Sequence, residues 1–292
     1  MTNHESLCGA LVVDKPSGPT SHDIVARARA LLKTKVGHTG TLDPLASGVL
    51  PLLLGRTTRL SRFFQSSDKE YLAEIQLGQT TDTLDAEGEV IQESSVPEIS
   101  PQQAQKVLEE FTGEIQQQPP MFSAVKVGGK KLYQLARQKL EIDRPWRTVS
   151  VYRIELLEQT REIWSLRVHC SSGTYIRSLA HEIGKTLSCG AYLRKLRRIR
   201  CGCFHLSGAL QLEGLEGQWR EALLPMEKLL PELPRIDLDE QQAKRVRHGN
   251  EISGSSQVQE EFCRLFHHQK LVAIGQSGPA NQLRPVIVLR GA

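Results

Sequence analysis

Apolar residues recur along the chain with two periods, and these periods predict the order of strands and helices. Period two is typical of a strand with one buried face, and a period of 3.6 residues is typical of an amphipathic helix. In the first third of the chain, apolar runs predict strands over Leu7–Val13, Val49–Leu54 and Lys69–Leu77. A helical stripe predicts a helix from Thr20 or Ser21 to about Lys33, with Asp23 completing a capping box.

The middle of the chain continues with the same two patterns. They predict a helix that opens at Ser100-Pro101 and ends before Gly113, then two long strands over Thr148–Gln159 and Glu162–Cys170. Thr174 is expected to cap the next helix, which places Tyr175 and Arg177 in its first turn. A cation is unfavourable at the positive end of a helix dipole unless an anion lies close by. Arg177 is therefore a candidate partner for a carboxylate.

The pattern of prolines and apolar runs changes near Leu230, and this change predicts the boundary between two domains. Three prolines punctuate this region, and short apolar runs over Leu271–Gly275 and Arg284–Leu289 suit a compact β-rich module. We expect a large domain over residues 1–230 and a small β-rich domain over residues 231–292. A length of 292 residues is compatible with both, because a typical domain has about 100–200 residues.

Composition and charge narrow the class of protein. The net charge of +4 is too small to identify a partner, and no apolar run approaches the ~20 residues of a membrane span. The first six residues are polar, so we expect a cytoplasmic protein. The six cysteines form no paired CxxC motifs. Cys263 lies close in sequence to His267 and His268, but no second group of ligands is present to complete a metal site with them. We therefore expect reduced thiols and no metal site.

The stretch from Gly37 to Pro51 contains the candidate nucleophile, Asp43. Glycines at 37, 40 and 48 permit tight turns and close backbone approach, and Pro44 keeps Asp43 out of helical dihedral angles. The competing interpretation is an ordinary Asp-Pro turn before the following apolar strand, and local chemistry alone favours that interpretation.

Six separated blocks, in order, resemble the TruB-type tRNA pseudouridine synthases, which isomerise the uridine at position 55 in the T-loop of tRNA. The blocks are Asp14-Lys15-Pro16, Gly37 to Pro51, Lys69 with Tyr71, Phe122 to Lys126, Ser172 to Arg177, and Gly190 to Arg198. The resemblance implies an α+β fold with a central mixed, largely antiparallel sheet flanked by helices. It also implies that residues 231–292 form a PUA-like RNA-binding module.

The resemblance also implies roles for individual residues. Asp43 is then the nucleophile, Arg177 its counter-charge, and Tyr71 the ring that stacks on the flipped uracil and assists proton transfer. Tyr175 and Leu196 resemble walls of the uracil pocket, and His38 resembles the residue that fills the gap left by the base. The remaining substrate-binding candidates are Lys15, Arg59, Lys126, Lys130, Arg197 and Arg198. Lys15 is expected to order the nucleophile loop rather than to touch RNA, whereas core roles for Tyr71 and Leu196 stay open.

Two basic regions are expected to face the RNA backbone. A thumb-like insertion over residues 120–147 carries seven cations against two acids from residue 126 onward, and a second cluster spans Arg194 to Arg200. A solvated protein face is the alternative for the second cluster. The expected partner is the T-arm of tRNA, bound by a monomer without a cofactor, because isomerisation is redox-neutral. The rival functions are an RNA-binding factor without chemistry and an aspartyl hydrolase of small molecules, which lacks a histidine base at motif spacing.

Overall fold

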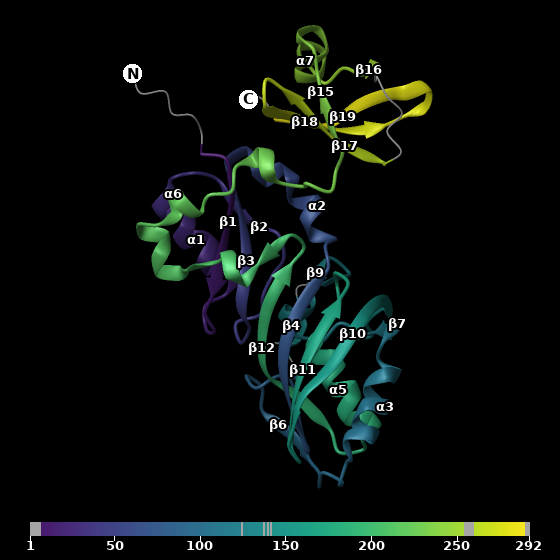
Figure 1. The fold of residues 1–292 in the computed structure, drawn as a ribbon. Helices are drawn as coiled ribbons and strands as arrows, with labels where there is room; N and C mark the ends of the chain where they lie inside the picture. The colour runs from purple at the N-terminus through teal and green to yellow at the C-terminus, as the bar shows by residue number, and fades with distance from the viewer. Residues whose placement is uncertain are drawn as a thin grey trace.

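In the computed structural model, most strands belong to two β-sheets, a large one and a smaller one near the C-terminus (Figure 1). The model describes residues 7–123, 125–136, 138, 140, 142–253 and 260–289. Within them, the large sheet has the strand order β14-β1-β3-β12-β4-β11-β10-β7, with β2 beside β3 and β13 beside β12. Its strands are β1 (Gly9–Lys15), β2 (Val36–His38), β3 (Ser47–Leu54), β4 (Lys69–Leu77), β7 (Gly113–Gln117), β10 (Arg147–Gln159), β11 (Ile163–Cys170), β12 (Ala191–Cys201), β13 (Phe204–His205) and β14 (Leu210–Gln211).

The pairing of these strands is mostly antiparallel. Among the described strands of the large sheet the exceptions are β1 with β14 and β3 with β12, which run parallel. The expected mixed, largely antiparallel α+β sheet is thereby confirmed. Two hairpins lie outside the large sheet, formed by β5 (Gln79–Thr81) with β6 (Val90–Glu93) and by β8 (Lys126–Val127) with β9 (Lys130–Lys131).

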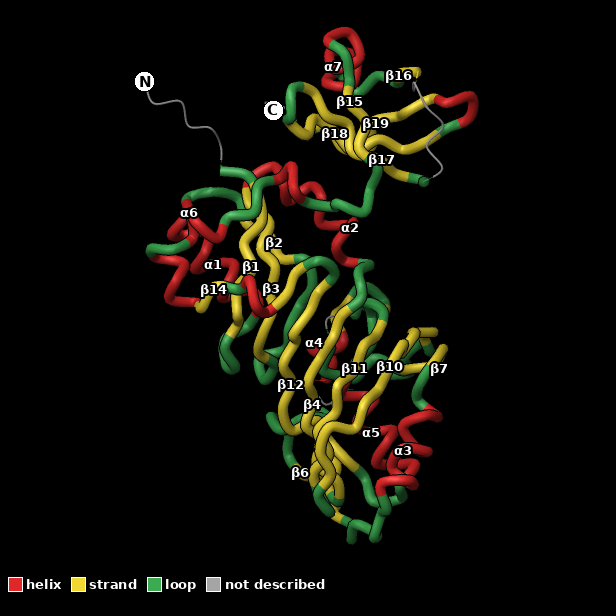
Figure 2. Tube along the Cα trace, viewed as in Figure 1, coloured by secondary structure: helices red, strands yellow, loops and turns green. Residues whose placement is uncertain are grey.

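Helices lie beside both sheets, and α7 lies beside the C-terminal one, as the tube in Figure 2 shows. They are α1 (Ser21–Leu32), α2 (Ser61–Gln65), α3 (Pro101–Glu110), α4 (Leu132–Ala136), α5 (Ile176–Thr186), α6 (Trp219–Ala222) and α7 (Glu240–Arg247). α1 begins with the predicted capping box between Thr20 and Asp23. No helix in the described ranges is both long enough and apolar enough to span a bilayer.

The start of α5 differs from the prediction. Tyr175, not Thr174, is the N-cap residue, and no side chain caps the helix. Thr174 Oγ1 instead donates a hydrogen bond to the backbone oxygen of Ser171 at 3.0 Å, within the preceding turn. The buried side chain of Gln117 supplies polar partners here, because its Oε1 accepts from Tyr175 N at 2.8 Å and its Nε2 donates to Tyr175 O at 3.1 Å.

The C-terminal sheet has the order β15-β17-β18-β19-β16. Its strands are β15 (Arg235–Asp237), β16 (Ile252–Ser253), β17 (Phe262–His267), β18 (Lys270–Ser277) and β19 (Gln282–Val288). One buried apolar cluster joins this sheet to the large one, since it contains Val12 and Leu53 together with Phe266 and Leu271. The two sheets therefore share part of their core.

Truncating Phe266 is expected to destabilise the whole chain. The side chain is 2% exposed within the shared cluster, so Phe266→Ala is expected to lower the free energy of unfolding by about 3–5 kcal/mol. Because the cluster includes residues of both sheets, thermal unfolding followed by circular dichroism and calorimetry should show one transition at a lower temperature. Two transitions, of which only one moves, would contradict the shared core.

Candidate active site

The nucleophile loop, residues 39–46 between β2 and β3, is held by hydrogen bonds from several directions. At the start of α1, Ser21 Oγ donates to Leu42 O at 2.9 Å and accepts from Leu42 N at 2.8 Å. Gly18 N donates to Pro44 O at 2.9 Å, and Leu42 itself is buried in the core. A loop that only connects two strands needs no such set of contacts, so its conformation is set by the fold.

Among the glycines of this loop region, Gly48 is the one whose position requires glycine. Its φ is +103°, and an added Cβ would lie 2.2 Å from the backbone oxygen of Arg198. The parallel pairing of β3 with β12 places these two residues opposite each other. At Gly37 and Gly40 an added Cβ would make ordinary contacts, so the expected need for glycine at those two positions is not met.

Asp43 faces Arg177, as the position of that cation in the helix suggested. Arg177 Nε lies 3.0 Å from Asp43 Oδ2, and the Asp43 side chain is 37% exposed, whereas that of Arg177 is 5% exposed. The Nε–H has no aligned hydrogen-bond acceptor, so the contact with Asp43 is an ion pair rather than a well-formed hydrogen bond. The site thus presents one partly accessible carboxylate against a buried cation.

A second carboxylate, Asp85, completes this arrangement and was not anticipated from the sequence. Arg177 Nη1 lies 3.2 Å from Asp85 Oδ2, and the Asp85 side chain is 4% exposed. The guanidinium also donates to the backbone oxygens of Thr83 at 3.3 Å and Phe122 at 2.8 Å. Asp85 therefore binds the Arg177 guanidinium through a different nitrogen from the one that faces Asp43.

The electrostatic balance at Asp43 raises its pKa above the usual value. Loss of solvent contact is the largest cause; Arg177 opposes it, and the negative charge of Asp85 adds to it. The nearby Glu87 carboxyl also has a raised pKa, because of burial and then the charges of Asp85 and Asp43. The Arg177 guanidinium thus favours the ionised form of Asp43 against the effects of burial and of Asp85.

The aromatic and apolar candidates line the same face of the large sheet. Tyr71 on β4 and Leu196 on β12 are 8% and 9% exposed, and both belong to the core cluster that α5 covers. Burial raises the pKa of the Tyr71 phenol, so it stays protonated at neutral pH. Tyr175 is half-buried at the start of α5. Burial raises the pKa of its phenol, and the charges of Asp43 and Arg177 have smaller effects on this pKa.

His38, at the end of β2, is uncharged at neutral pH. Burial, and then the charge of Arg198, lowers the pKa of its imidazole. Its Nδ1 is buried and has no hydrogen-bond partner. A neutral ring with an unsatisfied nitrogen suits contact with another group better than proton transfer at neutral pH.

Lys15 anchors the nucleophile loop, as expected. Its side chain is fully buried, and Nζ donates to the backbone oxygens of Pro19 at 2.7 Å, Pro16 at 2.9 Å and Pro44 at 3.2 Å. Burial lowers the pKa of this ammonium group to about 8. Lys15 thus ties the tip of β1 to the residue that follows Asp43.

Replacing Lys15 by methionine is expected to change how stability depends on pH. Because the folded-state pKa lies below the ordinary 10.5, the unfolded chain binds more protons between these values. This group therefore raises the wild-type free energy of unfolding by up to about 2 kcal/mol from pH 8 to pH 10, and Lys15→Met lacks this rise. Denaturant unfolding at the two pH values measures the difference, and equal changes in both proteins would contradict it.

The basic cluster from Arg194 to Arg200 lies on a central strand, and all its cations except Arg198 are on the solvent-exposed face of that strand, as the alternative interpretation expected. The structure places these residues in β12, between β3 and β4. Arg198 is 1% exposed, so the prediction that it contacts RNA phosphate is wrong. Arg197 is 40% exposed on its side chain and pairs with the buried Asp14 carboxylate at 2.7 Å, so its charge is largely compensated within the protein.

The other basic candidates lie apart from Asp43. Arg59 is exposed and donates to the backbone oxygen of Val288 in β19, so it joins the two sheets. Lys130 is exposed in the short hairpin of the insertion. The side chain of Lys126 and several positions of residues 120–147 lie outside the described part of the chain. The phosphate contacts of Arg59, Lys126 and Lys130 stay predictions.

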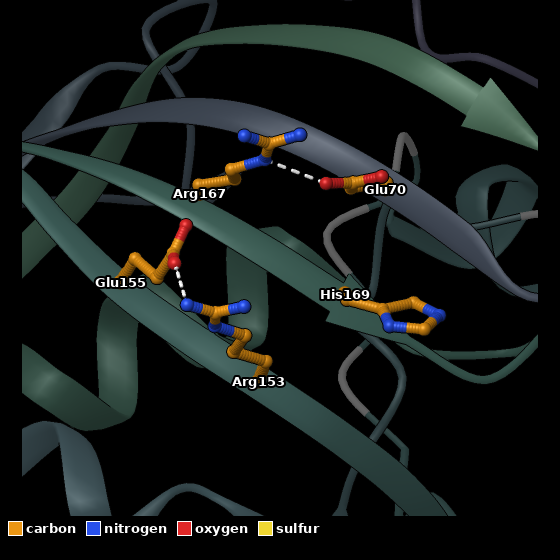
Figure 3. A pocket seen from close by; sticks show the side chains of 5 residues that line it. All are labelled: Glu70, Arg153, Glu155, Arg167 and His169. Carbon is orange, nitrogen blue, oxygen red and sulfur yellow. Dashed lines mark hydrogen bonds and ion pairs between the residues drawn. The ribbon is translucent and has the colours of Figure 1, made fainter. Parts of the chain in front are cut away.

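The opposite face of the sheet contains a hollow whose charges are internally paired (Figure 3). Glu70, Arg153, Glu155, Arg167 and His169 line it. Arg167 Nε lies 2.6 Å from Glu70 Oε1, and Arg153 pairs with Glu155. Because each arginine here already has a carboxylate, the hollow offers no excess positive charge for an anionic substrate.

One group in the C-terminal sheet has donor atoms that could surround a metal ion. Ligand atoms of Glu240, His267 and His268 lie within 4.8 Å of one another, whereas Cys263 donates its thiol to Gly275 O. However, Arg247 Nη2 lies 3.2 Å from His267 Nδ1, and His267 Nε2 contacts Glu240 Oε2 at 3.1 Å. A fixed guanidinium next to the ring opposes a metal cation, so we assign no metal role.

Three family models match consecutive parts of the chain, and the last of them begins close to the start of the C-terminal sheet. Residues 28–176 match the N-terminal domain of the TruB family pseudouridylate synthases. Residues 177–231 match the C-terminal domain of tRNA pseudouridylate synthase B, and residues 234–289 match the TruB C-terminal region of pseudouridine synthase II. The chain belongs to the TruB family of pseudouridylate synthases. The family inferred from the separated motifs is thereby confirmed, and the chain is an isomerase.

Individual relatives of this TruB family chain cover nearly its whole length. The tRNA pseudouridine synthase B of Dechloromonas aromatica is 44% identical, covering 95% of this chain and 94% of that protein. The tRNA pseudouridine synthase B of Solibacter usitatus is 41% identical, covering 96% and 99%. A chain in the crystal structure of a Cbf5-Nop10-Gar1 complex has a TM-score of 0.72 and 31% identity, covering 94% of this chain and 79% of that one.

One signal in the sequence could have found Asp85. The tripeptide Thr-Leu-Asp occurs at Thr41–Asp43 and again at Thr83–Asp85. In this TruB family fold both aspartates contact Arg177, one through Nε and the other through Nη1. Backbone hydrogen bonds on both sides of Asp85 keep it in place, since Leu193 N on β12 donates to Leu84 O and Ala86 N donates to Leu193 O, both at 3.0 Å.

Proposed function

We propose that this protein isomerises uridine to pseudouridine at position 55 in the T-loop of tRNA, with Asp43 as the nucleophile and without a cofactor. The observation that carries the proposal is the pairing of a partly exposed carboxylate, Asp43, with the buried guanidinium of Arg177. Relatives named tRNA pseudouridine synthase B, which cover nearly the full chain, support the substrate.

The reaction exchanges one glycosidic bond for another. The target nucleotide leaves its stack, and the Asp43 carboxylate attacks either the uracil ring or the anomeric carbon of the ribose. The bond between N1 and the sugar breaks, the base rotates, and C5 forms the new bond to the sugar. The C5 proton is then released, and the carboxylate leaves unchanged. Arg177 keeps Asp43 ionised and oriented throughout.

The residues around Asp43 hold the displaced base. Tyr71 stacks on uracil, and a stacked base gains about 1–3 kcal/mol, which offsets much of the cost of unstacking. The raised pKa of the Tyr71 phenol supports stacking more strongly than removal of a proton. Tyr175 and Leu196 form the walls of the uracil pocket, and the neutral His38 ring fills the gap that the base leaves.

The RNA is bound outside this pocket by the thumb-like insertion over residues 120–147, with Lys126 and Lys130, and by the C-terminal module over residues 231–292. In this proposal residues 1–230 carry the chemistry. Phosphate contacts provide affinity and position rather than choice of base, so binding weakens as salt increases. We place the reaction in the cytoplasm and in a monomer.

The test uses an unmodified tRNA transcript labelled with tritium at C5 of uracil. The protein is expected to release one equivalent of tritium per tRNA, and a transcript with cytidine at position 55 is expected to release none. Release from both transcripts would overturn the T-loop position. Tight binding of the tRNA with no release from either would favour an RNA-binding factor without chemistry.

A further inference from the structure

Arg198 places a positive charge in the buried interior of the protein, next to the nucleophile loop. It lies on β12 directly opposite Tyr71 on β4, and its side chain is among the largest that are fully buried. A buried charge is costly unless its hydrogen-bonding groups are satisfied. The partners of this guanidinium therefore indicate why an arginine is placed here.

The guanidinium joins the nucleophile loop to strand β3. Nη2 donates to Gly40 O at 3.0 Å, Nη1 donates to Thr41 O at 3.5 Å, and Nε donates to Val49 O at 2.8 Å. Gly40 and Thr41 precede Asp43 by three and two residues. Only the planar fork of arginine presents several N–H groups at once in this fixed geometry.

The same guanidinium also reaches the stacking residue. Tyr71 is paired with Arg198 in the register of β4 and β12, so the two side chains lie on the same face of the sheet, and the positive charge of Arg198 opposes the rise that burial causes in the pKa of the Tyr71 phenol. The backbone of Arg198 is packed closely against Gly48, where an added Cβ would not fit, so the strand position from which the side chain extends is fixed. One side chain thus holds the loop that carries Asp43 and lies beside the residue that is proposed to stack on the base.

We propose that Arg198 is a positioning residue that fixes the distance between the nucleophile loop and Tyr71, and that it makes no contact with RNA. This inference rests on the proposed function. A displacement of about 1 Å between reacting groups can lower a rate by about 100-fold. Loss of this bridge therefore affects the chemical step while leaving the affinity for RNA unchanged.

Arg198→Lys tests the bridge, because lysine keeps the charge but has no planar fork. In single-turnover assays the rate is expected to fall about 10- to 100-fold. The Kd for tRNA and its salt dependence are expected to stay within about twofold, since no phosphate contact is lost. Arg200→Lys is the matched control: Arg200 lies on the same strand, is partly buried and pairs with Glu70 on the other face.

The control is expected to keep both the rate and the affinity. A higher Kd with a smaller salt slope in Arg198→Lys would indicate a phosphate contact and would overturn the proposal. An unchanged single-turnover rate in Arg198→Lys would overturn it as well. If the wild type itself releases no tritium, the proposed function fails, and the bridge is then judged by hydrogen exchange alone.

A double-mutant cycle separates positioning from general weakening of the fold. Tyr71→Phe removes only the phenol oxygen, so its effect on the rate should be smaller in the Arg198→Lys background than in the wild type. Independent, multiplicative losses would contradict the bridge.

Hydrogen exchange keeps the proposal testable if Arg198→Lys does not fold. The amide of Leu42 is hydrogen-bonded to Ser21 within the nucleophile loop and is distant in sequence from Tyr71. In Tyr71→Phe this amide is expected to exchange at least about threefold faster, because the guanidinium loses its interaction with the phenol. Unchanged exchange at Leu42 would overturn the coupling, whether or not the protein has activity.

Discussion

Asp43→Asn is expected to lower tritium release from labelled tRNA by at least about 1,000-fold, because the neutral amide is not a nucleophile. The Kd for tRNA should remain within about twofold, since the amide has nearly the same shape and phosphate contacts dominate affinity. The melting temperature should not fall, because burial and Asp85 already disfavour the charged form of this side chain. Single-turnover assays, filter binding and calorimetry measure these three quantities.

Asp237→Asn is the control for this experiment, since Asp237 is an exposed aspartate of the C-terminal sheet that pairs with Arg235. It should behave as the wild type in the rate assay. Full activity of Asp43→Asn would exclude Asp43 as the nucleophile. Loss of tRNA binding together with the activity would assign Asp43 a role in binding instead.

Arg177→Met is expected to remove most of the activity and to make the remainder more sensitive to acid. The guanidinium lowers the pKa of Asp43, so its removal raises that pKa further and reduces the fraction of carboxylate most strongly at low pH. We expect a loss of at least about 100-fold at pH 8 and a larger loss at pH 6. Single-turnover rates across this range measure the effect, and an equal loss at both values would contradict it.

The same substitution should also destabilise the fold. Arg177 and Asp85 are both almost fully buried, and removing one partner of such a pair costs about 3–5 kcal/mol. The additional change Asp85→Asn should restore part of that stability, because it removes the uncompensated charge. Activity should stay low in the double variant, since Asp43 still lacks its counter-charge.

Much of the site followed from the sequence because the relevant signals are local. The cation at the start of a helix indicated that Arg177 has an acidic partner, and the alternation along β4 placed Tyr71 on the core-facing side. The cap of α5 was wrong for a tertiary reason. Gln117, far away in the chain, contacts the backbone of Tyr175, so Thr174 is free to bond within its own turn.

The role of β12 could not be predicted because its pattern is broken. Register shifts between Leu193 and Lys195, and between Arg198 and Arg200, interrupt the period of two that marks a strand. The buried Arg198 then looks like one more member of a charged run, although its partners are backbone oxygens of a distant loop. Asp85 was missed because the repeat of Thr-Leu-Asp at Thr83–Asp85 does not by itself say that both aspartates meet the same arginine.

The position of β12 in the chain has a consequence for the order in which the protein is made. Residues 39–43 are synthesised early, whereas the strand that supplies Arg198 ends at Cys201. Folding during synthesis proceeds from the N-terminus, and contacts of large sequence separation form late. A nascent chain that ends before β12 therefore contains the loop around Asp43 without the Arg198 hydrogen bonds to Gly40 and Thr41. These contacts can form only after the chain as far as β12 has left the ribosome.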